Sequence, residues 1–298
     1  MADKVDLSAK KPQNKARTKT PKTEVDKTKT KNVAWWKVVL DILALLVWVG
    51  ASVVVAQLVV GHLMIWILGA ETFVQPVWTA VFSASSYLLA LVLVILVPPK
   101  ISVAFKLVNK HKDGKIKTIN NKTTPKAMGR TELGLRGWPT WTDIGLSLVG
   151  FIVYLMLAAG LTALFMFFPW FAEVADQSQD VGFNVLNSGL DRVVAFITLV
   201  VIAPIAEEII FRGWLYRKLR IKLSEKTSNL TGMVITILLV SLLFGLIHMQ
   251  WNVGVNVFAL SVVLCGLREI TGTIYAGILL HMLKNGIAFY MLYVLGIG

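Results

Sequence analysis

Long runs of apolar residues, separated by short polar stretches, dominate the chain. A helix needs about 20 apolar residues to cross a bilayer. Runs of about this length or longer lie near Val38–Leu68, Val77–Val97, Asp143–Phe168, Val193–Phe211, Thr231–Met249 and Thr273–Ile297. A shorter run, Val253–Leu267, is either a further span or a re-entrant or buried segment. The runs are continuous rather than alternating, which excludes a β-barrel pattern. The sequence therefore predicts an all-α polytopic membrane protein with about seven transmembrane helices, within a range of six to eight.

Charge is distributed unevenly between the polar stretches. The chain has 298 residues and a net charge of +13. Residues 1–37, 98–142 and 212–229 hold eleven, ten and six Lys or Arg, whereas residues 169–191 hold four acids and no Lys or Arg. Lys and Arg accumulate in cytoplasmic loops. We therefore expect a multi-pass protein of the cell membrane with a cytoplasmic N-terminus. Seven spans would place the C-terminus outside and six inside.

The basic charge is explained by topology and by attraction to anionic lipid, so it requires no nucleic-acid partner. Residues 1–37 form a basic cytoplasmic tail whose Lys- and Thr-rich composition predicts disorder. Residues 38–192 form the N-terminal transmembrane helices with a basic loop, and residues 193–298 form a helical core. Between the fourth and fifth runs, residues 214–222 alternate apolar and basic positions, which predicts an amphipathic helix at the cytoplasmic interface.

Candidate chemistry begins in the fourth run, which ends in Glu207-Glu208-Ile-Ile-Phe-Arg212. Ionisable residues inside a membrane are costly and usually face an interior cavity. On a helix, Glu208 and Arg212 are four residues apart and can pair. Glu207 points about 100° away. One reading is an ion pair that anchors a helix end. However, two carboxylates with one arginine leave one carboxylate unpaired, as a general base requires.

Two later runs each contribute one histidine. Phe244-Gly-Leu-Ile-His248 places an aromatic ring and an imidazole on one helical face, and His281-Met-Leu-Lys-Asn285 does the same for an imidazole and an amide. Either histidine alone is explained by an interhelical polar contact, worth about 0.6 kcal/mol on average. Three such groups in order on three successive apolar segments indicate instead a catalytic site inside the membrane.

These motifs, Glu-Glu-x-x-x-Arg, Phe-x-x-x-His and His-x-x-x-Asn, resemble the signatures of the CAAX protease and bacteriocin-processing family, also called CPBP or Abi. The resemblance covers roughly residues 193–290. It implies an intramembrane endopeptidase that cleaves a membrane-associated peptide or protein. Bacterial members are associated with bacteriocin maturation or self-immunity, and the length and Lys/Thr-rich tail of the chain suit a bacterial member.

The resemblance also implies roles for the motif residues. Glu207 would activate water with help from His248, and His281 and Asn285 would stabilise the oxyanion. Glu208, Arg212 and Phe244 would support the site. A metalloprotease is the alternative mechanism, because Glu207, His248 and His281 match the ligand set of some catalytic zinc sites. No His-Glu-x-x-His motif is present, and the metal-free glutamate mechanism is preferred.

Two other classes of function are open. One is a non-catalytic bacteriocin-immunity or scaffold protein that binds a toxin or sensor. The other is a proton-coupled transporter that uses Glu207 and the histidines as a relay. Counting residues from the expected span ends also raises a geometric problem, because Glu207 and His281 fall in the cytoplasmic half and His248 nearer the far side. The three groups can meet only if the fifth segment begins in the cytosol or is tilted.

Overall fold

The computed structural model describes residues 35–71, 75–112, 128–175, 177, 183, 186 and 188–296, with the backbone alone for residues 99–112. The regular structure of this part of the chain is entirely helical, as the apolar runs predicted. The expected disorder of residues 1–37 lies outside the described residues except for residues 35–37, which begin the first helix.

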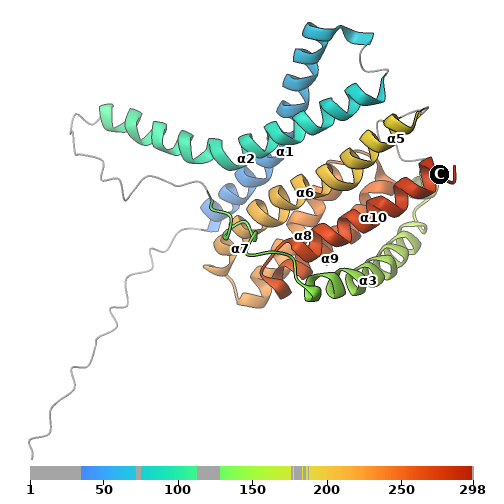
Figure 1. Cartoon of the computed structure of the whole chain (residues 1–298). Helices are drawn as coiled ribbons and strands as arrows, with labels where there is room; N and C mark the ends of the chain where they lie inside the picture. Colours follow the sequence, from blue (N-terminus) through green and yellow to red (C-terminus); the bar gives the residue numbers. More distant parts are fainter. Residues whose placement is uncertain are drawn as a thin grey trace, which may run out of the picture.

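The chain forms a bundle of long helices (Figure 1). The separate helices are α1 (Trp35–Leu68), α2 (Pro76–Lys112), α3 (Trp141–Phe165), the short α4 (Pro169–Ala172), α8 (Asn229–Leu246), α9 (Trp251–Thr271) and α10 (Tyr275–Tyr293). Residues 189–224 form one continuous helical run, here called the composite helix. It consists of α5 (Gly189–Phe196), η3 (Ile197–Ile202), α6 (Ala203–Glu208), η4 (Ile209–Leu215) and α7 (Tyr216–Ser224).

Six helical segments in the described part of the chain are long and apolar enough to cross a membrane. They are Trp35–Leu68, Pro76–Pro98, Trp141–Phe165, Gly189–Ser224, Asn229–Leu246 and Trp251–Thr271. The doubtful run Val253–Leu267 is thus part of a full helix, α9. α10 is not among these six, but it packs against α3, α9 and the composite helix, so a bundle of about seven membrane-spanning helices fits the structure.

The composite helix lies between α2 on one side and α10 on the other (Figure 1). It contains two π-helical segments, η3 and η4, which flank α6. π-Helical turns often occur at functional sites. In η3 the backbone N–H of Ala203 bonds to the carbonyl oxygen of Thr198, five residues earlier. In the same register Pro204 would follow as the donor to Leu199, but proline has no N–H. The Leu199 carbonyl is therefore available to a side chain.

The helix predicted over residues 214–222 exists, but it is not a separate interfacial element. It is α7, the continuation of the composite helix, and its residues Tyr216, Leu219 and Leu223 are buried. The chain turns after Ser224, and α8 then runs back beside α7. Because polar residues can extend a helix beyond an apolar run, the sequence alone placed the helix end too early.

Two glycines bring α8 and α9 close together. A Cβ atom added at Gly245 would lie 2.8 Å from the carbonyl oxygen of Gly254, and one added at Gly254 would lie 3.2 Å from that of Gly245. Any larger residue would push the two helices apart. Small residues at helix interfaces allow this kind of backbone approach in membranes, where packing rather than hydrophobicity drives association. The turn between α8 and α9 is thereby fixed just after His248.

Candidate active site

The carboxylate of Glu207 lies between α2 and α10. Its Oε1 atom accepts a hydrogen bond from the hydroxyl of Tyr87 on α2, with an O–O distance of 2.7 Å. Its Oε2 atom lies 3.7 Å from Nε2 of His281 on α10. The Glu207 side chain is 15% exposed, whereas that of its neighbour Glu208 is not exposed at all. Glu207 is therefore the carboxylate of the pair that a small molecule such as water can reach.

Glu208 forms the ion pair that the four-residue spacing predicted. Oε1 of Glu208 accepts a hydrogen bond from Nη1 of Arg212 at 2.9 Å, and both side chains are fully buried. The Arg212 guanidinium also lies 4.5 Å from the centre of the Phe244 ring, a cation–π contact. A buried charge needs a close partner, because the desolvation of an isolated ion is very costly. Glu208 and Arg212 thus neutralise each other and leave Glu207 outside the pair.

His281 lies between the two glutamates. Its Nδ1 atom is 3.2 Å from Oε1 of Glu208, and its Nε2 atom faces Glu207. The carboxylate of Glu208 can only accept a hydrogen bond, so Nδ1 carries the hydrogen. One turn before His281, a Cβ atom added at Gly277 would lie 3.1 Å from Oε2 of Glu208. The glycine therefore leaves room for this buried carboxylate beside the histidine.

Phe244 connects the two histidines. Its ring centre lies 5.1 Å from that of His248 and 6.0 Å from that of His281, in both cases edge to face. Nδ1 of His248 is 2.7 Å from the carbonyl oxygen of Phe244. Because a carbonyl only accepts, Nδ1 is the donor, and Nε2 of the neutral ring is left as an acceptor. His248 is within electrostatic reach of both Glu207 and His281.

Asn285 has a backbone partner that the sequence did not indicate. Its Nδ2 atom donates to the carbonyl oxygen of Leu199 at 2.9 Å. This is the carbonyl in η3 that Pro204 cannot serve. Asn285 therefore ties α10 to the composite helix one turn beyond His281. An amide nitrogen has two hydrogens, so one donor of Asn285 is used by this contact and a second is available.

The predicted site residues converge because the composite helix continues to Ser224. The number of residues from Glu207 to the end of α7 at Ser224 is about equal to the number from the start of α8 at Asn229 to His248. The two antiparallel segments therefore bring the two side chains to the same level of the bundle. The geometric difficulty came from placing the end of the fourth span at Phe211.

Two residues near Glu207 were not predicted from the sequence. Tyr87 belongs to no motif, and its only signal is that it ends a short polar stretch, Ser83 to Tyr87, within an apolar run. Lys284 lies inside the third motif, between His281 and Asn285, but is not one of its signature positions. Its half-buried side chain interacts electrostatically with Glu207 and His248. Both residues therefore act on the same carboxylate from opposite helices.

The zinc-ligand role expected of Glu207, His248 and His281 stays a prediction. Over the described ranges, no group of three His, Cys, Asp or Glu side chains is placed so that it could hold a metal ion. His281 directs one nitrogen to Glu208, and His248 directs one to a backbone carbonyl. Each ring thus keeps its Nε2 atom for another partner, an arrangement that histidine ligands of metal ions also use.

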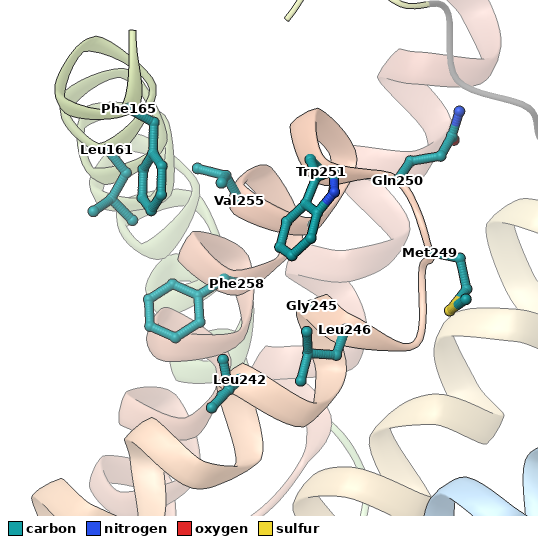
Figure 2. A pocket seen from close by; sticks show the side chains of 11 residues that line it. Leu161, Phe165, Leu242, Gly245, Leu246, Met249, Gln250, Trp251, Val255 and Phe258 are labelled. Carbon is teal, nitrogen blue, oxygen red and sulfur yellow. The ribbon is translucent and has the colours of Figure 1, made fainter. Parts of the chain in front are cut away.

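An apolar pocket of about 550 Å³ lies beside the turn that follows His248, and the turn residues Met249, Gln250 and Trp251 help to line it (Figure 2). Its walls come from α3, α8 and α9 and include Phe165, Leu246, Trp251 and Phe258. Gly245 and Gly254, at the close approach of α8 and α9, also line it. None of the motif residues lines this pocket, so it is separate from the cluster around Glu207.

Residues 189–287 match the family model described as type II CAAX prenyl endopeptidase Rce1-like. The match covers the composite helix, α8, α9 and most of α10, including every motif residue from Glu207 to Asn285. It does not include α1, α2 or α3. No curated protein and no solved structure matched the chain. The match supports an intramembrane endopeptidase of the CAAX type in general, and the resemblance of the motifs to the CPBP family is confirmed over residues 189–287.

Proposed function

We propose that the protein is an intramembrane endopeptidase in which Glu207 activates a water molecule. The difference between the two adjacent glutamates carries the proposal. Arg212 neutralises Glu208, whereas Glu207 accepts a hydrogen bond from the neutral Tyr87, is partly exposed and has two histidines nearby. A general base needs an ionised group that can be reached by the molecule it deprotonates. Glu207 meets this condition, and Glu208 does not.

In the proposed reaction, Glu207 takes a proton from water as the water oxygen attacks the carbonyl carbon of the scissile amide. Nε2 of His248, the free acceptor of that ring, helps to orient the water. The electrons of the carbonyl double bond move to its oxygen, which becomes an oxyanion. Glu207 then returns the proton to the amide nitrogen as the C–N bond breaks. The oxyanion electrons re-form the carbonyl double bond, so the products are a carboxylic acid and an amine, which exchange one proton to become a carboxylate and an ammonium group.

His281 and the second donor of Asn285 would stabilise the oxyanion. Since Nδ1 of His281 already donates to Glu208, Nε2 can donate only when the ring carries both protons. At full ionisation the charges of Glu207, Glu208, Arg212 and Lys284 sum to zero. Charge balance of this kind favours burial among apolar helices. Fixed donors aimed at a developing oxyanion are worth about 100-fold to 1,000-fold each in rate.

The proposed substrate is a membrane-associated peptide or protein, because α2, the composite helix and α8, which contribute to the site, are long and apolar enough to cross a membrane. The CAAX-type description of the matched family fits such a substrate. We extend the proposal to bacteriocin processing or self-immunity in a bacterial cell membrane, with the N-terminus on the cytoplasmic side. The basic residues in the stretches 1–37, 98–142 and 212–229 support this orientation.

The proposal can be tested with the purified, reconstituted protein and a library of membrane-embedded peptides, with and without a chelator. Wild type would be compared with Glu207→Gln and His248→Ala, and with Glu225→Gln as a matched control on an exposed glutamate. We expect the loss of one proton-transfer group to lower the cleavage rate by about 100-fold to 10,000-fold. Cleavage by wild type and by the Glu225 variant should survive the chelator.

Wild-type cleavage that stops in chelator and returns with added zinc would refute the metal-free mechanism. Equal cleavage by wild type and Glu207→Gln would refute the role of Glu207. If well-folded wild type cleaves nothing in the library, a non-catalytic immunity or scaffold function becomes the better account.

A further inference from the structure

One contact of Glu207 comes from outside the matched region. Tyr87 lies on α2, within the span Pro76–Pro98, and the family match begins only at residue 189. Its hydroxyl donates to Oε1 of Glu207 at 2.7 Å. A hydrogen bond from a hydroxyl to a carboxylate is shorter and about twice as strong as a neutral one. Inside an apolar bundle, water competes little for either partner, so this contact fixes one oxygen of the carboxylate.

The position of Tyr87 follows from a stripe along α2. Ala80, Tyr87 and Val94 are seven residues apart and lie on one face of the helix. Ala80 shares a buried cluster with Ala195 and Val200 of the composite helix. Val94 shares another with Ile210, Phe211 and Leu215. α2 therefore runs parallel to the composite helix, and the middle position of the stripe falls opposite Glu207.

The chemical nature of the donor also matters. Glu207 has two positive or potentially positive neighbours, Lys284 and His281. A close ion pair with Lys284 would hold the carboxylate but would also reduce its ability to take a proton. The phenol of Tyr87 carries no charge. It holds Oε1 and leaves the charge on the carboxylate, with Oε2 on the side of His281.

We propose that Tyr87 is the positioning residue of Glu207, so that helix α2 completes a site whose motif residues all lie in residues 207–285. This inference rests on the proposed function, in which Glu207 is the base. The hydrogen bond from Tyr87 on α2 would prevent the Glu207 side chain from turning toward Lys284. A misplaced base loses much of its effect, because proton transfer and attack require close alignment.

The first arm of the test is kinetic. Tyr87→Phe keeps the ring and its packing but removes the hydroxyl. We expect kcat to fall by about 10-fold to 100-fold, the size expected for one hydrogen bond to a charged group, with KM changed by less than about twofold if the bond acts only on the base. Tyr154→Phe is the matched control, because Tyr154 makes a similar bond of 2.6 Å to Asn256 between α3 and α9. Its kcat should equal that of wild type.

The second arm does not depend on activity. Infrared difference spectra of protein with ¹³C-labelled glutamate, taken between wild type and Glu207→Gln, isolate the carboxylate band of Glu207. Tyr87→Phe should shift this band, and in the Glu207→Gln background it should leave the carboxylate region of the spectrum unchanged. Tyr154→Phe should not shift it.

A lower kcat without a band shift would mean that the Tyr87 hydroxyl acts on something other than the Glu207 carboxylate, and it would overturn the inference. A band shift with an unchanged kcat would also overturn it. If wild type cleaves no peptide, the proposed function fails, and the infrared arm still decides whether Tyr87 holds the Glu207 carboxylate.

Discussion

The core formed by the composite helix and α8–α10 and the α1–α2 hairpin differ in how much of each faces its surroundings. Half of the apolar window of α9 and 44% of that of the composite helix are buried, against 22% for both α1 and α2. The core therefore carries most of the packing and all of the motif residues. The hairpin offers a lipid-facing surface and two polar side-chain contacts to the composite helix, Tyr87 with Glu207 and Asp41 with Lys222. Under the proposed mechanism, a peripheral helix contributes to the chemistry through a single side chain.

The largest contrast should appear when an ion pair is broken in each region. Arg212→Met leaves the fully buried Glu208 without its cation, which should cost about 3–5 kcal/mol of unfolding free energy. Lys222→Met breaks the pair between α7 and Asp41 of α1, where both side chains are partly exposed, and should cost at most about 1 kcal/mol. Denaturant unfolding in detergent would measure both.

The double variant Glu208→Gln with Arg212→Met should recover a large part of the loss, because no unpaired charge is left buried. Equal destabilisation by Arg212→Met and Lys222→Met would contradict the distinction between a buried pair in the core and a surface pair at the hairpin.

A smaller effect is expected at the glycine next to the paired carboxylate. In Gly277→Ala the new Cβ would lie 3.1 Å from Oε2 of Glu208, so this carboxylate and the adjacent His281 must move by a few tenths of an ångström. Misplacement by about 1 Å can cost about 100-fold in rate, so we expect a smaller fall in kcat, of roughly 10-fold. Gly266→Ala is the control, since nothing lies within 4 Å of its added Cβ. It should keep wild-type kcat.

The smallest effect tests the stripe on α2. Val94 is fully buried in the cluster with the composite helix, whereas Val92 is 40% exposed on the outer face. Val94→Ala leaves a small cavity and should cost about 1–2 kcal/mol of unfolding free energy. Val92→Ala should cost almost nothing, because lipid tails refill the space. If the two variants are equally stable, α2 does not pack against the composite helix in the register described.

The sequence was sufficient for the fold class and for the ion pair of Glu208 with Arg212. Both depend on local spacing: apolar runs give spans, and a separation of four residues gives a shared helical face. The meeting of Glu207, His248 and His281 was indicated by their order on successive segments. The depth of the fifth segment in the bundle was not predicted, because the basic residues of α7 indicated a helix end at Phe211. The composite helix instead continues to Ser224.

Other features depended on contacts between distant helices. Tyr87 was missed because one tyrosine in an apolar run has many possible partners. The length of α9 was underestimated because Asn252, Asn256 and Arg268 interrupt its apolar pattern, although Asn256 accepts a bond from Tyr154 and Asn252 donates to backbone carbonyls. The contact of Asn285 with Leu199 requires the π-helical register before Pro204, which no spacing rule gives.

The most direct test of the account compares the two adjacent glutamates. Peptide cleavage and unfolding would be measured for Glu207→Gln and Glu208→Gln in the same reconstituted preparation. The account predicts that Glu207→Gln folds as stably as wild type and has lost cleavage, whereas Glu208→Gln, which leaves Arg212 without its anion, is destabilised. Wild-type cleavage by Glu207→Gln would contradict the claim that Glu207 is the base.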